Sequence, residues 1–105
     1  MREITPLELK QRQQAGERIT MIDVREAFEK EIADIGGVLI PKAEILNRQS
    51  EIPRDGIVVI YCRSGGRSSS AIKALQQQCG FTNLVNLSGG ILRWSDEVDS
   101  SIEKY

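Results

Sequence analysis

The sequence predicts a three-layer α/β domain in which helices cover both faces of a central parallel sheet of four to five strands. Short, β-branched segments at residues 19–24, 38–40, 57–61 and 83–87 alternate with helical segments. Parallel strands need a crossover, usually a helix, to return the chain to the same edge of the sheet. The 105 residues, 40% hydrophobic and 28% charged, match one soluble core, so we expect a single domain over residues 1–105.

The first elements have clear boundary signals. Thr5 and Pro6 suit the N-cap and first position of a helix, and Gly16 suits the position just past its end. The strand at residues 19–24 follows, and a second helix is predicted from residue 26 to about residue 33. The chain therefore enters its first strand only after a helix.

The middle of the chain is predicted to contain only short elements. Gly36 and Gly37 end the second helix, and a short apolar strand covers residues 38–40. Residues 42–46 are predicted to form a brief turn or helix. Residues 48–56 are predicted to be a loop.

The second half contains the clearest buried strand, residues 57–61, which leads directly into a glycine-rich loop. A helix is predicted from near Ser68 to the Cys79 region, where a glycine follows. The strand at residues 83–87 precedes a last helix that runs to about Val98. We expect the tail to fray after that helix, from Asp99 onward.

Composition excludes several classes of function. A formal net charge of −1 gives no field that would attract nucleic acid or an acidic membrane, so neither is expected as a partner. The chain has no histidine and two cysteines, which excludes a histidine-assisted nucleophile and a four-cysteine zinc site. No metal or organic cofactor is implied. The N-terminus lacks the pattern of a signal peptide, and no apolar run approaches the roughly 18 residues of a membrane span, so a cytoplasmic location is expected.

The loop after the strand at residues 57–61 is the candidate catalytic site. Cys62 lies at the strand end, glycines allow the loop amides to turn inward, and the next helix adds its dipole. Such surroundings should acidify the thiol below its free pKa of about 8.5, which would make it a nucleophile. We therefore expect Cys62 to be catalytic and an anionic substrate to be bound by Arg63, Ser64, Gly65, Gly66, Arg67 and Ser68.

Polar residues at other strand ends are candidates for supporting roles. Asp23 and Ser88 lie near the carboxyl ends of their strands, which meet at one edge of a parallel sheet together with Cys62. Asp23 and Arg25 could face the substrate or could pair with each other. We favour a structural pair, because ionised groups at a buried strand end need partners.

Three ordered motifs resemble those of the rhodanese-like sulfurtransferases. Residues 22–26 look like the family's early D-V-R-E element, residues 62–68 look like its active-site loop, and residues 86–90 with Trp94 look like its late G-G-x-x-x-W element. The resemblance covers nearly the whole chain. It implies a rhodanese-like fold and a persulfide on Cys62, whose sulfur comes from a donor such as thiosulfate or a desulfurase and passes to a thiophilic acceptor.

A finer resemblance is to the C-terminal rhodanese domain of the ubiquitin-activating-type adenylyltransferases of molybdopterin and thiamin synthesis. It depends on Leu-Ile-Pro-Lys at residues 39–42, on the loop, and on the ending V-D-x-S-x-x-x-Y at residues 98–105. The resemblance implies a small sulfur-carrier protein as acceptor and a fused or separate adenylyltransferase domain as partner. The chain departs from the family at residues 33–38, which have Asp34 where histidine is frequent and are one residue shorter, so the register of the strand at Val38 is left open.

Two other functions compete with this one. The cysteine-dependent phosphatases and arsenate reductases also place a thiolate in an arginine-closed anion loop. Only four residues separate Cys62 from Arg67, and Tyr61 precedes the cysteine, which favours a cradle for one sulfur over one for a tetrahedral phosphate. A non-catalytic rhodanese-like binding domain is the third alternative, against which the intact cysteine argues.

Two further residues are predicted to pack rather than react. Cys79 ends a helix that would place it roughly 16 Å from the loop, too far for a disulfide with Cys62. Trp94 shares a helix face with Ile91 and Val98, which is typical of core packing.

Overall fold

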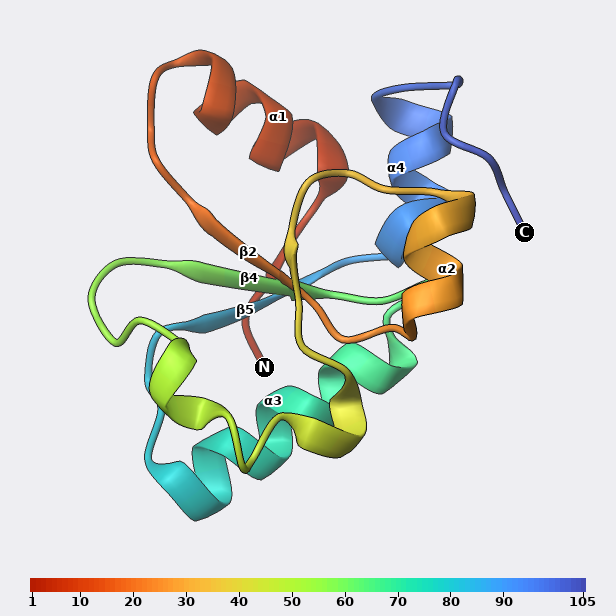
Figure 1. The fold of residues 1–105 in the computed structure, drawn as a ribbon. Coiled ribbons are helices and arrows are strands. Elements are labelled where there is room, and N and C mark those ends of the chain that lie inside the picture. The colour runs from red at the N-terminus through yellow and green to blue at the C-terminus, as the bar shows by residue number, and fades with distance from the viewer.

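A single parallel sheet organises the chain in the computed structural model, which describes residues 1–105 (Figure 1). The strand order is β1-β5-β4-β2-β3, and every pair of neighbours is parallel. The α/β prediction with four to five strands is confirmed. The strands are β1 (Glu3–Ile4), β2 (Thr20–Asp23), β3 (Val38–Leu39), β4 (Val58–Tyr61) and β5 (Leu84–Leu87).

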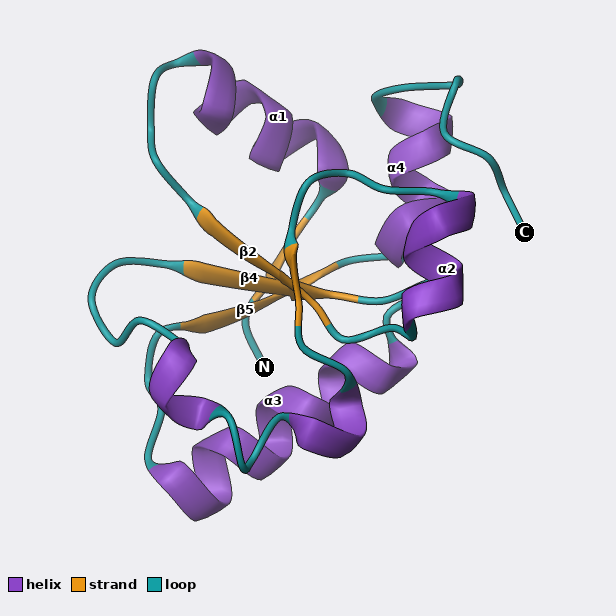
Figure 2. Cartoon of the chain, in the orientation of Figure 1, coloured by secondary structure: helices purple, strands orange, loops and turns teal.

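Helices cover both faces of this sheet (Figure 2). One face packs against α1 (Pro6–Gln14) and α4 (Gly90–Glu97), and the other packs against α3 (Gly66–Cys79). The short helix α2 (Ala27–Ile32) lies beside the carboxyl ends of the strands (Figure 1). No helix combines the length and the apolar character needed to cross a bilayer.

Strand β4 lies at the centre of the sheet and is apolar on both sides, as a doubly covered strand must be. Val58 and Ile60 join the core beneath α3, whereas Val59 and Tyr61 join the core beneath α1 and α4. All four residues are buried. The chain leaves this strand directly into the candidate loop, so the loop starts from the buried centre of the sheet.

The predicted boundaries hold for most elements. The Thr5 hydroxyl accepts a hydrogen bond from the Glu8 backbone N–H at the start of α1, and Gly16 has a positive φ just past its end. The open register of β3 is now defined: Ile22 pairs with Val38 and Asp23 with Leu39. The shortened segment before β3 is therefore accommodated without loss of the strand.

Three local details differ from the predicted elements. Strand β1 precedes α1, where no strand was expected, because two residues suffice to pair with the edge of β5. The predicted loop at residues 48–56 contains a 3₁₀ turn, η2 (Gln49–Glu51), after the first 3₁₀ turn η1 (Lys42–Glu44). Helix α3 starts at Gly66 rather than near Ser68, because Gly65 takes the left-handed conformation that begins it.

The prediction that the tail frays after Asp99 was wrong. The Ser95 hydroxyl donates to the carbonyl oxygen of Ile102 at 2.7 Å, which folds the tail back along α4. Ile102 and Tyr105 pack against the core beneath α1 and α4. The tail thereby brings Tyr105 to the end of the sheet where α2 lies.

Candidate active site

The carboxyl ends of β2 and β4 meet at one edge of the sheet. Asp23 ends β2 opposite Tyr61, the last residue of β4, and Cys62 follows immediately. Cys62 is 1% exposed, so its sulfur is enclosed by the loop that leads into α3. The expectation that strand ends bring Asp23 and Cys62 to the same edge is confirmed.

The Cys62 sulfur faces hydrogen-bond donors of its own loop. The backbone N–H groups of Gly65 and Ser68 donate to it at 3.1 and 3.4 Å, and the Ser68 hydroxyl lies 3.4 Å away. Burial alone raises the pKa of the Cys62 thiol, but the Ser68 hydroxyl and the backbone N–H groups of Ser68, Gly65 and Ser64 outweigh it. The net pKa of Cys62 is lowered, which favours the nucleophilic thiolate.

Two glycines are required to build this loop, and a third is not. Gly65 has a φ of 109°, which only glycine adopts readily, and this turn aims its N–H at the sulfur. Gly90, with a φ of 60°, lies so close to the loop that a Cβ would come within 2.5 Å of the Cys62 and Arg63 carbonyl oxygens. At Gly66, which was also predicted to shape the cradle, a Cβ would meet nothing within 4 Å.

The first turn of helix α4 packs against the Cys62 loop and hydrogen-bonds to its backbone. The Ile91 N–H donates to the Cys62 carbonyl at 3.0 Å, and the Leu92 N–H donates to the Arg63 carbonyl at 3.1 Å. The first turn of a helix has N–H groups without partners of their own, and here the loop supplies the acceptors. Gly90, the second glycine of the late pair, thus allows the start of α4 to approach the Cys62 loop.

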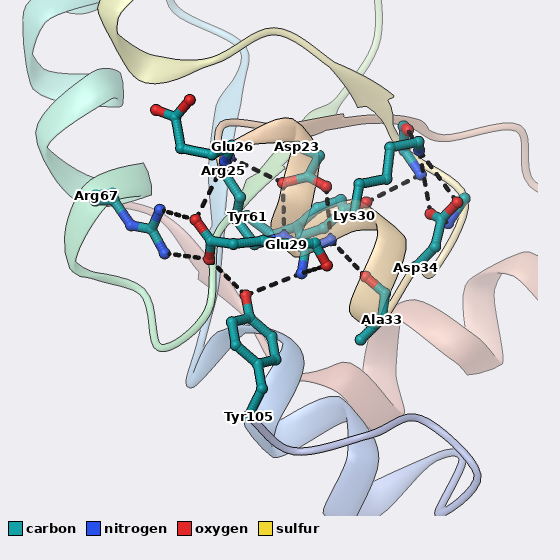
Figure 3. A network of polar contacts seen from close by, with 12 residues as sticks. Asp23, Arg25, Glu26, Glu29, Lys30, Ala33, Asp34, Tyr61, Arg67 and Tyr105 are labelled. Atoms are coloured by element: carbon teal, nitrogen blue, oxygen red, sulfur yellow. Dashed lines mark hydrogen bonds and ion pairs between the residues drawn. The ribbon is translucent and has the colours of Figure 1, made fainter.

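Arg67 lies in an ion pair. Its two terminal nitrogens donate to the Glu29 carboxylate of α2 at 2.6 and 2.8 Å (Figure 3). This Arg67 contact lowers the pKa of Glu29 to about 2, against the opposing effect of burial. The structure thus joins Arg67 to Glu29, and the role of Arg67 in binding an anion stays a prediction.

Asp23 and Arg25 form the expected pair at the end of β2. Arg25 donates to both carboxylate oxygens of Asp23, at 2.9 and 2.8 Å, and both side chains are fully buried. Arg25 also donates to the carbonyl oxygens of Glu29 and Ala33, which fixes α2 to the strand end (Figure 3). The contacts are structural, and a supporting role in the reaction stays a prediction.

Tyr105 connects the tail to this network. Its hydroxyl accepts a hydrogen bond from Arg25 at 2.9 Å and donates one to Glu29 at 2.6 Å (Figure 3). Arg63, whose side chain leaves the loop, lies over the Tyr105 ring at 5.3 Å and donates to the Tyr105 carbonyl. The tail therefore contacts the Cys62 loop at Arg63, and it also contacts Glu29, the partner of Arg67.

Several residues of the site were missed from the sequence. Glu29 gave no signal beyond a charge on a predicted helix, and Tyr105 lay in the segment expected to fray. Asn86 did give a sequence signal, because it is a polar residue in the otherwise apolar strand β5. Conversely, Ser88 makes its side-chain hydrogen bond with Arg93 rather than with the loop.

The two residues predicted to pack do so. Trp94 is buried in the core beneath α1 and α4. Cys79 is partly buried against the core beneath α3, and both cysteines are free thiols.

Cys62 thus lies at the end of a central parallel strand, in a loop whose amides face its sulfur. The family model described as rhodanese-like domain matches residues 5–97, and this chain belongs to that family. The recognition made from the three motifs is confirmed.

Individual relatives agree with this assignment. The "Sulfurtransferase" of Allochromatium vinosum is 43% identical over 94 residues, which cover 89% of this chain and 87% of that protein. The "Probable adenylyltransferase/sulfurtransferase MoeZ" of Mycobacterium tuberculosis is 36% identical over 105 residues, 97% of this chain but 26% of that protein. The chain thus spans about a quarter of the MoeZ protein. A rhodanese-related protein of Thermoplasma volcanium has the same fold, with a TM-score of 0.81, 31% identity and coverage of 93% of this chain and 94% of that one.

Proposed function

We propose that this protein is a persulfide-forming sulfurtransferase in which Cys62 takes a sulfane sulfur from a donor such as thiosulfate and passes it to a thiophilic acceptor. The observation that carries the proposal is the enclosure of the Cys62 sulfur by the Gly65 and Ser68 N–H groups, with a lowered thiol pKa. The sulfurtransferases among its relatives support the same reaction class.

The first half-reaction balances without a cofactor. The Cys62 thiolate attacks the outer sulfur of thiosulfate, an S–S bond forms, the S–S bond of thiosulfate breaks, and sulfite leaves with the electron pair. The persulfide then carries the negative charge on its outer sulfur. Preorganised N–H groups stabilise such a charge because they need not reorient as it develops.

The second half-reaction returns the enzyme to its starting state. The acceptor attacks the outer sulfur, and Cys62 leaves as the thiolate. A lowered thiol pKa assists this step as well, because a more acidic thiol is a better leaving group. The same environment thus serves both halves of the cycle.

The acceptor in this proposal is a small sulfur-carrier protein, and an adenylyltransferase domain, fused or separate, is the further partner. The names of two relatives support this context, "Adenylyltransferase and sulfurtransferase UBA4" and the MoeZ protein. Arg63 is exposed at the loop and would meet an anionic donor or acceptor first. A reducing compartment such as the cytoplasm would keep both cysteines as the thiols that the reaction needs.

Intact mass spectrometry tests this proposal. Thiosulfate should add about 32 Da to the wild-type protein, one sulfur on a thiol, and cyanide should remove it. Cys62→Ser should gain nothing, while the matched control Cys79→Ala should gain as much as wild type. If neither thiosulfate nor a cysteine desulfurase produces the adduct, the proposal is wrong, and an assay for phosphatase activity is the next step.

A further inference from the structure

Asn86 is a buried polar side chain in the middle of β5. It is 3% exposed and its backbone is fixed on both sides, opposite Ile60 of β4 and Glu3 of β1. Its N–H donates to the Arg2 carbonyl at 2.9 Å. A side chain that starts from so rigid a backbone can hold another group in a defined position.

The side-chain amide of Asn86 has a single consistent orientation. One end lies 3.2 Å from the Gly65 carbonyl oxygen, and the other lies 2.5 Å from the Ser68 hydroxyl. A carbonyl oxygen can only accept a hydrogen bond, so the Asn86 NH₂ must face Gly65. The Asn86 oxygen therefore faces Ser68 and must accept the hydroxyl proton.

This orientation has a consequence for Cys62. The Ser68 hydroxyl has one proton and three acceptors within reach, the Asn86 oxygen at 2.5 Å, the Gly65 carbonyl at 3.2 Å and the Cys62 sulfur at 3.4 Å. While Cys62 is a neutral thiol, the proton lies on the shortest contact, to Asn86, and the Ser68 oxygen presents lone pairs to the sulfur. That arrangement suits a thiol, which can donate, but not a thiolate, which can only accept. The lowered pKa of Cys62 includes the hydrogen bond that forms when the hydroxyl turns to the thiolate.

We propose that Asn86 is a positioning residue that controls the direction of the Ser68 hydroxyl, and thereby decides whether the Cys62 thiolate receives that hydrogen bond. The thiolate and the Asn86 oxygen compete for the one proton. When the proton turns to the sulfur, the buried Asn86 oxygen loses its partner, which has a cost.

The inference rests on the proposed persulfide cycle for its functional meaning. In the persulfide the charge lies on the outer sulfur, and the inner sulfur becomes a weak acceptor like a thioether. The Ser68 proton then returns to Asn86. Asn86 thus disfavours the bare thiolate relative to the persulfide, which favours retention of the loaded sulfur.

The charged groups around Cys62 do not supply this control. Arg67 of α3 is held by Glu29 of α2, and Asp23 of β2 is held by Arg25. Arg63 of the loop turns to the tail. None of these side chains donates a hydrogen bond to the Cys62 sulfur, whose donors are the Gly65 and Ser68 groups.

The test is the rate of alkylation of Cys62 by iodoacetamide as a function of pH, in a Cys79→Ala background. Asn86→Ala frees the Ser68 hydroxyl for the thiolate, so the rate below the thiol pKa should rise about threefold, as expected from one neutral hydrogen bond. Ser68→Ala should lower the rate. The double variant should match Ser68→Ala, because without the hydroxyl Asn86 has nothing to direct.

The opposite pattern would overturn the proposal. If Asn86 only braces the loop, Asn86→Ala lowers the rate and lowers it again in the Ser68→Ala background. Asn86→Leu, which keeps the volume of the side chain, gives the same readout if the alanine variant unfolds. No sulfur donor is used, so this result is independent of the mass measurement on which the proposed function stands.

Discussion

Two polar regions lie side by side at the ends of β2 and β4, and they are built in opposite ways. Around the Cys62 sulfur the hydrogen-bond donors are backbone N–H groups and one hydroxyl. Beside it, the ionic network of Asp23, Arg25, Glu29, Arg67 and Tyr105 consists of side chains that satisfy one another (Figure 3). One region presents dipoles to a reactive atom, and the other cancels its own charges.

The difference shows that the residues of one sequence motif, residues 62–68, have two kinds of role. Some surround the Cys62 sulfur, and another belongs to the ionic network that holds the helices together. Arg67 belongs to the candidate loop by sequence, yet its guanidinium pairs with Glu29 and joins α3 to α2. The two arginines of the network are matched by two carboxylates, so little net charge remains to act on the sulfur. In the proposed cycle the Cys62 thiolate would depend chiefly on the preorganised backbone N–H groups of its loop, which change little between the states of the cycle.

The largest expected effect is on the ionic network. Arg25→Met leaves Asp23 as an unpaired buried charge and should lower the free energy of unfolding by about 4 kcal/mol. Urea denaturation at neutral pH measures this loss in the free energy of unfolding. The control is Arg12→Met, which removes an exposed pair with Glu17 and should change stability far less than Arg25→Met does. Equal losses in the two variants would contradict a scaffold centred on Arg25.

The next effect concerns the closure of the catalytic loop. Gly90→Ala forces a Cβ onto the Cys62 and Arg63 carbonyls and strains a positive φ, so stability should fall by about 3 kcal/mol and sulfur loading should slow. The matched control is Gly66→Ala, where the space is open and φ is ordinary. It should be neutral or slightly stabilising. Thermal unfolding and the rate of persulfide formation distinguish the two glycines, and similar behaviour would show that α4 does not constrain the loop.

A smaller effect appears on acidification. The pKa of Glu29 is lowered from 4.5 to about 2, so folding favours its ionised form. Its contribution to stability is complete above pH 4.5 and is lost as the pH falls toward 2. Glu29→Gln should be less stable than wild type at pH 7, and the difference should shrink by pH 3. A constant difference in urea denaturation across that range would mean that Glu29 acts by packing alone.

The sequence was sufficient for the features that local chemistry determines. Alternating apolar segments predicted the sheet, and the glycines around Cys62 predicted the inward-facing loop. The signals were strong because a buried strand and a left-handed turn each demand particular residues.

The ionic network could not be predicted in the same way. Glu29 and Arg67 are 38 residues apart, and Tyr105 and Glu29 are 76 apart. Long-range pairing leaves no periodic trace in one sequence, because each member alone resembles a solvated surface residue. The sequence neighbours of Arg67 accordingly predict that it binds the substrate, and the position of Tyr105 predicts that it lies in a fraying tail.

The smallest expected effect isolates the contribution of that tail. Tyr105→Phe removes only the hydroxyl that links Arg25 to Glu29, and it keeps the ring beneath Arg63. The free energy of unfolding should fall by about 1 kcal/mol, the value of a hydrogen bond to charged partners that remain well paired. In the Glu29→Gln background the loss should be smaller, because the hydroxyl then donates to a neutral acceptor. Full additivity of the two substitutions would mean that the tail and α2 are not energetically coupled, and the ionic network would then end at Glu29.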